Sequence, residues 1–354
     1  MTATGEVNVV RARRDSVSAE IAKAIDAVSG VKPDEGGCSR PSASRPVAAR
    51  RFGPLVASLS PFRILVTDNT SGRELAAMSR SVLIPTDGGP LSRDALEYAI
   101  ATFPDATFTL VHVVDPRYTD PDEDELRPER AFTDLLDVAG RHDIEVETEI
   151  RVGHPSREIV AVSEDNAVDD IVMGSHGREG ASRILLGSIA ERVLRRAPVP
   201  VTIVRPHQRT GNKHHLVPID DSDQSRKALE YAVSVFPEVE TTILHAIDPM
   251  ETHYGEGQLV YSETEYERIE TEAEQLLANA VDSVRASDAH VSATKVVEWG
   301  PNRPADAILD YVEDSDVDHV IMGSHGRSGI SRVLLGSVAE TVARRSPAPV
   351  TVVR

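Results

Sequence analysis

From residue 78 onward, short apolar runs alternate with segments whose apolar side chains recur at helical spacing. The run at 81–85 ends in polar turn residues, and the segment 92–103 after it has its apolar residues on one helical face. The alternation continues to residue 204, with strands expected at 81–85, 107–114, 144–153, 169–173 and 200–204 and helices at about 92–103, 131–140, 156–166 and 188–196. Strands that alternate with helices predict a parallel sheet with helices on both faces.

The second half of the chain repeats this order. Residues 216–232 match residues 83–99 at a constant offset of 133, and the offset has grown to 149 by a later glycine-rich segment. Most of the insertion therefore lies after the second strand of the second copy. We expect two copies of one domain, at residues 78–206 and 212–354, joined by a short polar linker.

Residues 1–77 differ in character from the rest. One amphipathic helix is expected at about 16–28, and the stretch after it is rich in Pro, Gly, Ser and Arg and cannot bury enough apolar surface to order itself. Residues 64–68 have strand character, but the distance to the next strand is too short for a parallel crossover. We expect a disordered or accessory extension, and a start site placed upstream of Met78 would explain the change in composition.

The formal net charge of −19 argues against nucleic acid or an anionic membrane as the main partner. Most of the negative charge lies after residue 77. Such a surface resembles that of proteins adapted to high salt, and an ordinary acidic cytosolic protein is the alternative. The single cysteine, Cys38, excludes an internal disulfide and a thiolate metal cluster. No apolar run reaches the ~20 residues of a membrane span, and we expect a soluble, cytoplasmic protein.

One glycine-rich segment occurs twice, at residues 174–205 and 323–354, with 23 of 32 positions identical. Each copy follows an apolar run and contains Gly-x-x-Gly, nine residues, and Gly-Ser. A strand that leads into such a turn and then a helix presents free backbone N–H groups to a phosphate. The residues are Gly174, Gly177, Gly187 and Ser188 in the first copy and Gly323, Gly326, Gly336 and Ser337 in the second.

Each glycine of this pattern has an expected role. The first lets backbone approach a ligand without a Cβ clash, and the second allows a turn with positive φ. The Gly-Ser pair begins a helix whose first N–H groups have no internal partner and favour an anion. The alternative is two tight turns that bind nothing.

Asp87 and Asp220 each follow the first strand of their domain. In an open parallel sheet the ligand crevice lies at the carboxyl ends of the strands, where the strand order reverses. A carboxylate there can accept hydrogen bonds from ribose hydroxyls, and the alternative is a turn-stabilising aspartate.

Four histidines lie near these motifs: His112, His176, His245 and His325. A zinc site needs three or four converging ligands, and the sequence does not supply them. We expect solvated or locally hydrogen-bonded histidines and no metal site.

Both halves resemble the universal stress protein family, in its nucleotide-binding branch with the pattern G-x2-G-x9-G-[ST]. The resemblance covers residues 78–206 and 212–354. It implies an α/β fold of two tandem Rossmann-like domains, each an open parallel five-stranded sheet of order 3-2-1-4-5 flanked by helices. It also implies ATP, with or without Mg²⁺, at the point where the strand order reverses.

The resemblance assigns contacts residue by residue. Asp87 would contact the ribose or adenine side, the backbone of Val113 would face adenine, and the glycine-motif residues would hold ribose and phosphates. The nucleotide-binding residues implied are Asp87, Val113, Gly174, Gly177, Gly187 and Ser188, with Asp220, Ala246, Gly323, Gly326, Gly336 and Ser337 in the second domain. That domain departs from the first at 221–223, where Asp-Ser-Asp replaces Gly-Gly-Pro. The added negative charge is expected to weaken the second site or to demand Mg²⁺.

In this family the last strands pair between subunits and form dimers. With two domains in one chain, residues 200–204 and 349–353 can pair internally and form a pseudo-dimer. The resemblance leaves open whether the chain also forms a homodimer, and it identifies no regulatory protein partner.

The leading interpretation is an ATP-binding stress-response or regulatory protein with little or no catalysis. One alternative is a slow ATPase or an adenylyl-transferring enzyme. The phosphate-loop lysine of Gly-x4-Gly-Lys-[Ser/Thr] is absent, and we assign no catalytic residue. A second alternative is a nucleotide-independent scaffold, which the retention of the glycine pattern in both halves disfavours.

Overall fold

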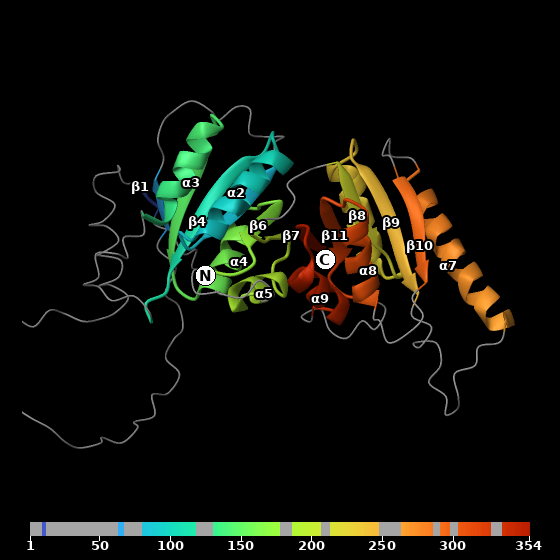
Figure 1. Ribbon diagram of the computed structural model, residues 1–354. Helices are drawn as coiled ribbons and strands as arrows, with labels where there is room; N and C mark the ends of the chain where they lie inside the picture. The colour runs from blue at the N-terminus through green and yellow to red at the C-terminus, as the bar shows by residue number, and fades with distance from the viewer. Residues whose placement is uncertain are drawn as a thin grey trace, which may run out of the picture.

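The computed structural model describes residues 9–11, 63–66, 80–117, 130–177, 186–206, 213–247, 263–285, 291–297, 304–326 and 335–354. Within them, the strands form one sheet of order β1-β2-β5-β4-β3-β6-β7-β12-β11-β8-β9-β10. Figure 1 shows the two halves of this sheet side by side, with their outer strands farthest apart. The helix expected at 16–28 lies outside the described residues.

The first domain has parallel strands in the order 3-2-1-4-5, as expected. They are β3 (Ser81–Thr86), β4 (Thr107–Val114), β5 (Val146–Val152), β6 (Asp170–Gly174) and β7 (Val201–Val204). One face of the sheet is covered by α2 (Pro90–Thr102) and α3 (Arg130–Arg141), and the other by α4 (Pro155–Asp165) and α5 (Ser188–Leu194).

The pattern of burial explains why these elements form. In β3, Val82 and Ile84 are buried in the layer under α2, whereas Leu83 is buried in the opposite layer. This period of two is that of a strand covered on both faces. Helix α2 begins with Pro90 at its first position, where a missing N–H costs nothing, and buries Ala95, Leu96 and Ala99.

The second domain repeats the fold with the strand order reversed along the sheet. Its strands are β8 (His214–Pro218), β9 (Glu240–Ile247), β10 (Val291–Val297), β11 (His319–Gly323) and β12 (Val350–Val353). Its helices are α6 (Asp223–Val235), α7 (Glu263–Ser283), α8 (Pro304–Asp314) and α9 (Ser337–Arg345). Helix α7 has 21 residues and its counterpart α3 has 12, so the longer helix takes up part of the expected insertion.

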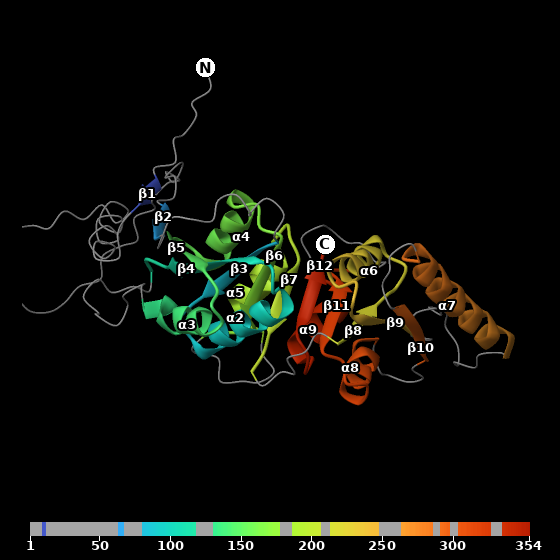
Figure 2. The same cartoon turned by 90° about the horizontal axis from the view of Figure 1, so that it is seen from above.

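The two domains join through their fifth strands. Strand β12 pairs antiparallel with β7, and Thr351 lies opposite Thr202. These threonines correspond under the offset of 149, so a local two-fold axis passes between them. Figure 2 shows β7 and β12 adjacent at the centre of the molecule. Because the pairing is antiparallel, the carboxyl ends of the two sets of strands lie at opposite edges of the sheet.

The outer edge of the first domain carries two further strands, β1 (Val9–Arg11) and β2 (Arg63–Val66). Strand β2 pairs antiparallel with β5. The strand character expected at 64–68 is therefore present at 63–66, beside β5 at this outer edge and not beside β3, the next strand in the chain. In the part of the chain that the structure describes, no helix is long and apolar enough to cross a membrane.

Candidate functional site

The carboxyl ends of β3 and β6 bring Asp87 and the glycine turn together. Oδ1 of Asp87 accepts hydrogen bonds from the backbone N–H of Gly89 at 2.8 Å and from the hydroxyl of Ser92 at 3.1 Å. Its other oxygen faces Gly177, where an added Cβ would lie 2.7 Å from Oδ2. The carboxylate is therefore held against the turn by groups at the start of α2.

The expectation that Gly177 takes a positive φ is wrong. The positive φ values of described glycines occur at Gly88 and Gly153, and neither Gly177 nor Gly326 has one. A Cβ at either position would force the aspartate carboxylate to move. The constraint is steric and not conformational.

The first glycine of the motif is also constrained by packing. A Cβ on Gly174 would lie 2.8 Å from Cβ of Leu91, so the space expected for a ligand next to this atom is filled by α2. Gly187 donates a 2.7 Å hydrogen bond to the carbonyl of Ser175. This bond closes the turn onto the helix that follows, although residues 178–185 lie outside the described part of the chain.

The remaining predicted residues lie around the same strand ends. Val113, half-buried, is one residue beyond His112, which pairs with Thr86 at the end of β3. Ser188 is exposed at the first position of α5, and Gly187 caps that helix without a side-chain hydrogen bond. Gly187 has no side chain with which to cap the first backbone N–H groups of α5.

The second domain builds the same arrangement. A Cβ on Gly326 would collide with Oδ2 of Asp220, more severely than in the first domain. Gly323 packs against the backbone of Gln224, and Gly336 donates a 2.8 Å hydrogen bond to the carbonyl of Ser324. Ser337 is exposed at the first position of α9, and Ala246 is half-buried on β9. The structure therefore brings the six predicted residues of each domain to one edge of the sheet.

The turn after the first strand differs between the domains. Gly88 has a φ of 75°, and its counterpart Asp221 has a φ of 65°. Aspartate tolerates this left-handed region better than most residues but less well than glycine. The replacement thus keeps the turn and adds a carboxylate.

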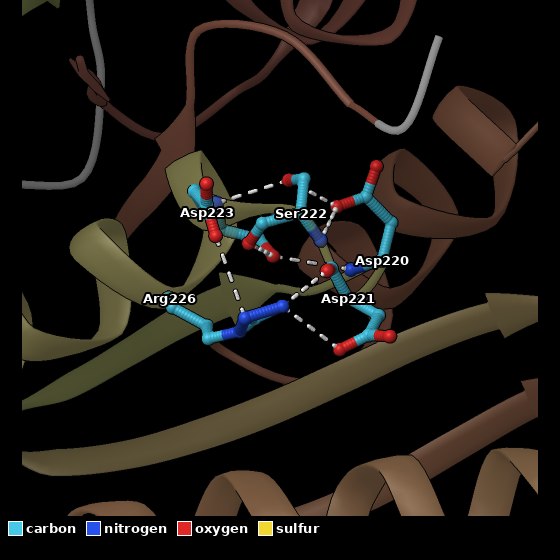
Figure 3. A network of polar contacts seen from close by, with 6 residues as sticks. Asp220, Asp221, Ser222, Asp223 and Arg226 are labelled. Atoms are coloured by element: carbon cyan, nitrogen blue, oxygen red, sulfur yellow. Dashed lines mark hydrogen bonds and ion pairs between the residues drawn. The ribbon is translucent and has the colours of Figure 1, made fainter. Parts of the chain in front are cut away.

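Arg226 lies beside these added carboxylates, as Figure 3 shows. It donates to the carbonyl oxygen of Asp221 at 2.7 Å and to its Oδ1 at 3.2 Å, and it lies 3.5 Å from Oδ1 of Asp223. Its counterpart Arg93 instead contacts Glu97 one turn further along α2. The extra negative charge of the second site is thus partly compensated within the turn. A cavity of about 70 Å³ opens beside it between α6 and α7.

Two serines that the sequence reasoning missed hold the aspartates. Ser92 donates to Asp87, and Ser222 donates to Oδ1 of Asp220 at 2.6 Å from its hydroxyl. Ser225, the counterpart of Ser92, instead donates to the carbonyl of Ser222. The repeat pairs Ser92 with Ser225, which each accept a 3.4 Å hydrogen bond from the backbone N–H of the aspartate. It pairs Ser222 with Gly89, so it gave no signal for Ser222.

The histidines near the site make local hydrogen bonds. Nδ1 of His112 donates to the carbonyl of Thr86 at 2.8 Å, and Nδ1 of His245 donates to that of Ile219 at the same distance. His176 and His325 each lie 3.0 Å from the hydroxyl of the preceding serine. Among the described residues, no group of three or more His, Cys, Asp or Glu side chains is arranged to hold a metal ion.

The family model and the relatives found by comparison with known proteins point to the same family. The model of the universal stress protein family matches residues 78–205 and 211–354. A universal stress protein of Mycolicibacterium smegmatis is 28% identical over 301 residues, which cover 79% of this chain and 98% of that protein.

Solved structures are also similar. The crystal structure of a universal stress protein from Archaeoglobus fulgidus has 27% identity and a TM-score of 0.55, and the match covers 78% of this chain and 99% of that one. A universal stress protein in complex with cAMP has 25% identity and a TM-score of 0.30, over 40% of this chain and 97% of that one.

Proposed function

Because the chain belongs to the universal stress protein family, we propose that it binds adenine nucleotide, with ATP as the main ligand, in two sites. One site lies in each domain, at the carboxyl ends of the first and fourth strands. The protein acts as a nucleotide-dependent stress or regulatory component and not as a catalyst.

One observation supports this proposal most directly. In both domains a fixed aspartate lies against the second glycine of the motif so closely that a Cβ would collide with its Oδ2. The aspartate follows strand one and the glycine follows strand four, and these strands are neighbours where the strand order reverses. A ligand crevice is expected at this point of an open parallel sheet.

The proposed contacts follow from the chemistry of each group. Asp87 and Asp220 have oxygens suited to ribose hydroxyls. The N–H groups at Ser188 and Ser337, which Gly187 and Gly336 do not cap, are suited to phosphate oxygens. The backbones of Val113 and Ala246 lie on the adjacent strand, on the side proposed for adenine. The glycines let the turn pack closely against α2 or α6 and against the aspartate, which brings these groups together.

The proposed sites differ in their use of Mg²⁺. The first has no carboxylate in its turn besides Asp87, whereas the second adds Asp221 and Asp223, which Arg226 contacts. A triphosphate entering the second site meets added negative charge, which Mg²⁺ offsets. We expect Mg²⁺ to raise ATP affinity more at the second site than at the first.

Equilibrium dialysis of the full chain with ATP, ADP, AMP and cAMP tests the proposal. ATP should bind most tightly, because the motif is assigned to the phosphates, and a variant carrying Gly177→Val and Gly326→Val should bind none of them. Tighter binding of AMP or cAMP than of ATP would contradict the assignment. Absence of nucleotide binding by the wild type would favour a nucleotide-independent scaffold. Binding by the double variant equal to that of the wild type would show that the nucleotide does not occupy the glycine turns.

A parallel assay of phosphate release decides between binding and catalysis. The same double variant serves as the control for contaminating activity. Wild-type release should not exceed that of the control, because no lysine of the phosphate-loop type is available to the β- and γ-phosphates. Release clearly above it would favour the enzyme interpretation.

A further inference from the structure

Each fifth strand ends in an arginine that reaches into the other domain. Arg205 follows β7, and its Nη2 donates to the carbonyl of Ala343 in α9 at 3.0 Å. Arg354 follows β12, and its Nη2 donates to the carbonyl of Leu194 in α5 at 2.9 Å. The arginines and their acceptors correspond under the offset of 149, so the two contacts are related by the local two-fold axis.

The acceptors lie at the ends of the helices that follow the glycine motifs. Leu194 is the last residue of α5, and Ala343 is in the last turn of α9. A cationic donor at the C-terminal end of a helix satisfies a carbonyl without an intrahelical partner and opposes the negative end of the helix dipole. Helix α5 has only two turns, so a shift at Leu194 moves Ser188 directly.

The other end of each contact is tied to the arginine's own glycine turn. The carbonyl of Val353, just before Arg354, accepts a 2.8 Å hydrogen bond from the N–H of Ser324. The carbonyl of Ser324 in turn accepts from Gly336, the glycine before α9. Arg354 thus connects the turn of the second site to the helix of the first.

The first domain has the same series of bonds. Ser175 donates its N–H to the carbonyl of Val204 at 2.8 Å, and its own carbonyl accepts from Gly187 at 2.7 Å. Arg205 follows Val204 in the chain, and its side chain contacts α9 of the other domain. Its side chain lies in the interface and is 7% exposed, and burial together with the charge of Arg344 lowers its pKa to about 10. The guanidinium therefore remains charged at neutral pH.

A third contact crosses the interface on the same face of the sheet. Arg195, at the end of α5, lies 2.9 Å from Glu191 in its own helix and 3.2 Å from Glu340 in α9. Arg344 also contacts Glu340, at 2.6 Å. Helices α5 and α9 are therefore held to each other as well as to the opposite arginines.

We propose that Arg205 and Arg354 are positioning residues that act across the domain interface: each holds the helix of the other domain's nucleotide site and couples the two sites. The coupling is positive. A nucleotide bound at one glycine turn fixes the fifth strand and its arginine through Ser175 or Ser324, and the helix at the opposite site is then already in place when the second nucleotide binds. The inference rests on the function proposed above.

The test measures ATP affinity in full-length chains with a single active site. Gly326→Val leaves the first site, and Gly177→Val leaves the second. In the first background, Arg354→Gln should weaken ATP binding about fivefold or more, while Arg205→Gln changes it less than about twofold. In the Gly177→Val background the effects should be reversed: Arg205→Gln should weaken ATP binding about fivefold or more, and Arg354→Gln should change it less than about twofold.

Two controls separate positioning from general loss of structure. Arg354→Lys keeps a cationic donor and should restore part of the affinity. Arg345→Gln removes an arginine near the end of α9 whose contact, with Asp306 at 2.6 Å, stays within the second domain, and it should leave the first site unchanged. In otherwise wild-type chains, Arg354→Gln with Arg205→Gln should reduce the Hill coefficient for ATP from above 1 to 1.

A readout without nucleotide completes the test. Amide hydrogen exchange in residues 188–194 should accelerate in Arg354→Gln, and exchange in 337–345 should accelerate in Arg205→Gln, each without the other. If the wild type binds ATP but each arginine variant weakens both sites equally, or neither site, the coupling is overturned and the proposed function is left in place. Absence of ATP binding by the wild type overturns the proposed function and the coupling with it.

Discussion

At the scale of single residues, close approach decides which positions must be glycine. Gly177 and Gly326 lack positive φ, yet each lies where a Cβ would meet an aspartate oxygen. Gly187 and Gly336 are less crowded, with 3.1 Å from the added Cβ to the Cα of a histidine. The motif therefore contains glycines of unequal sensitivity to substitution.

Gly326→Ala should be more damaging to ATP binding than Gly336→Ala. The added methyl group displaces Asp220, which Ser222 holds through its backbone N–H and hydroxyl. Loss of these two hydrogen bonds, at about 1 kcal/mol each, corresponds to about thirtyfold weaker binding at the second site. Titration of both variants in the Gly177→Val background measures this, and equal affinities would contradict the steric account.

Asp221→Gly should stabilise the second domain and strengthen its site. The substitution introduces the residue found at the counterpart position, Gly88, and relieves a left-handed backbone cost of up to about 1 kcal/mol. It removes one carboxylate from the turn, and the ion pair that is lost with Arg226 is exposed and weak. Thermal unfolding and ATP titration check the two effects, and a lower Tm would show that the turn does not need glycine.

At the scale of elements, the two fifth strands form the central contact. Thr202 and Thr351 lie with their hydroxyl oxygens 2.6 Å apart, and the hydroxyl of Thr351 is also 2.7 Å from Nε2 of His319. These three side chains are almost fully buried. Their polar groups therefore depend on one another for partners.

Thr351→Val should destabilise the protein more than Thr202→Val. The first change leaves both His319 Nε2 and the Thr202 hydroxyl without this partner, and such losses cost about 1–3 kcal/mol. The second change leaves the contact between Thr351 and His319 in place and should cost about 1 kcal/mol. Chemical denaturation of both variants gives the comparison. The opposite ranking would show that the histidine contact adds little.

The sequence predicted the elements well where pattern and repetition agree. The alternation from 81 to 204, the fifth-strand segments and the glycine motif all follow from local periodicity. The residues that join the domains did not follow from it. Arg354 meets Leu194 only after folding brings residues 160 positions apart together. Tyr231 in the second domain likewise donates to Asp170 in the first. The repeat relates Arg205 to Arg354 at the offset of 149, but the sequence does not show which carbonyls accept their hydrogen bonds.

At the scale of the whole molecule, the two domains also meet on the other face of the sheet, and the contacts there are asymmetric. On the face covered by α2 and α6, Tyr231 donates to the buried Asp170 at 2.6 Å. The counterpart contact joins Tyr98 to His319 edge to face, with ring centroids 5.9 Å apart. His215 lies against His319 with centroids 4.9 Å apart. One half of the interface is thus ionic and the other half contains neutral imidazoles.

Acid should weaken the half that contains the imidazoles. Burial lowers the pKa of His215 to about 3 and that of His319 well below its usual value. These folded-state pKa values lie below the unfolded value of about 6.5. Below that pH the unfolded state binds protons more tightly than the folded state does, so the free energy of unfolding is highest above pH 6.5 and falls as the pH falls toward 3. His215→Val introduces the residue at the counterpart position, Val82.

The His215→Val variant should lose less stability in acid than the wild type. Between pH 7 and pH 5 one such histidine costs about 2 kcal/mol, so the free energy of unfolding of the variant should fall by about that much less. Urea denaturation at both pH values measures the difference. Parallel pH dependence of the two proteins would show that His215 does not set the acid limit.

The stoichiometry of ATP binding shows whether each domain holds one nucleotide. Titration calorimetry of the full chain should give two ATP molecules per chain for the wild type. Gly177→Val and Gly326→Val should each give one, and the double variant should give none. This series is expected if the aspartate and glycine contact in each domain marks a nucleotide site. A wild type that binds no ATP, or a double variant that still binds two, would contradict it.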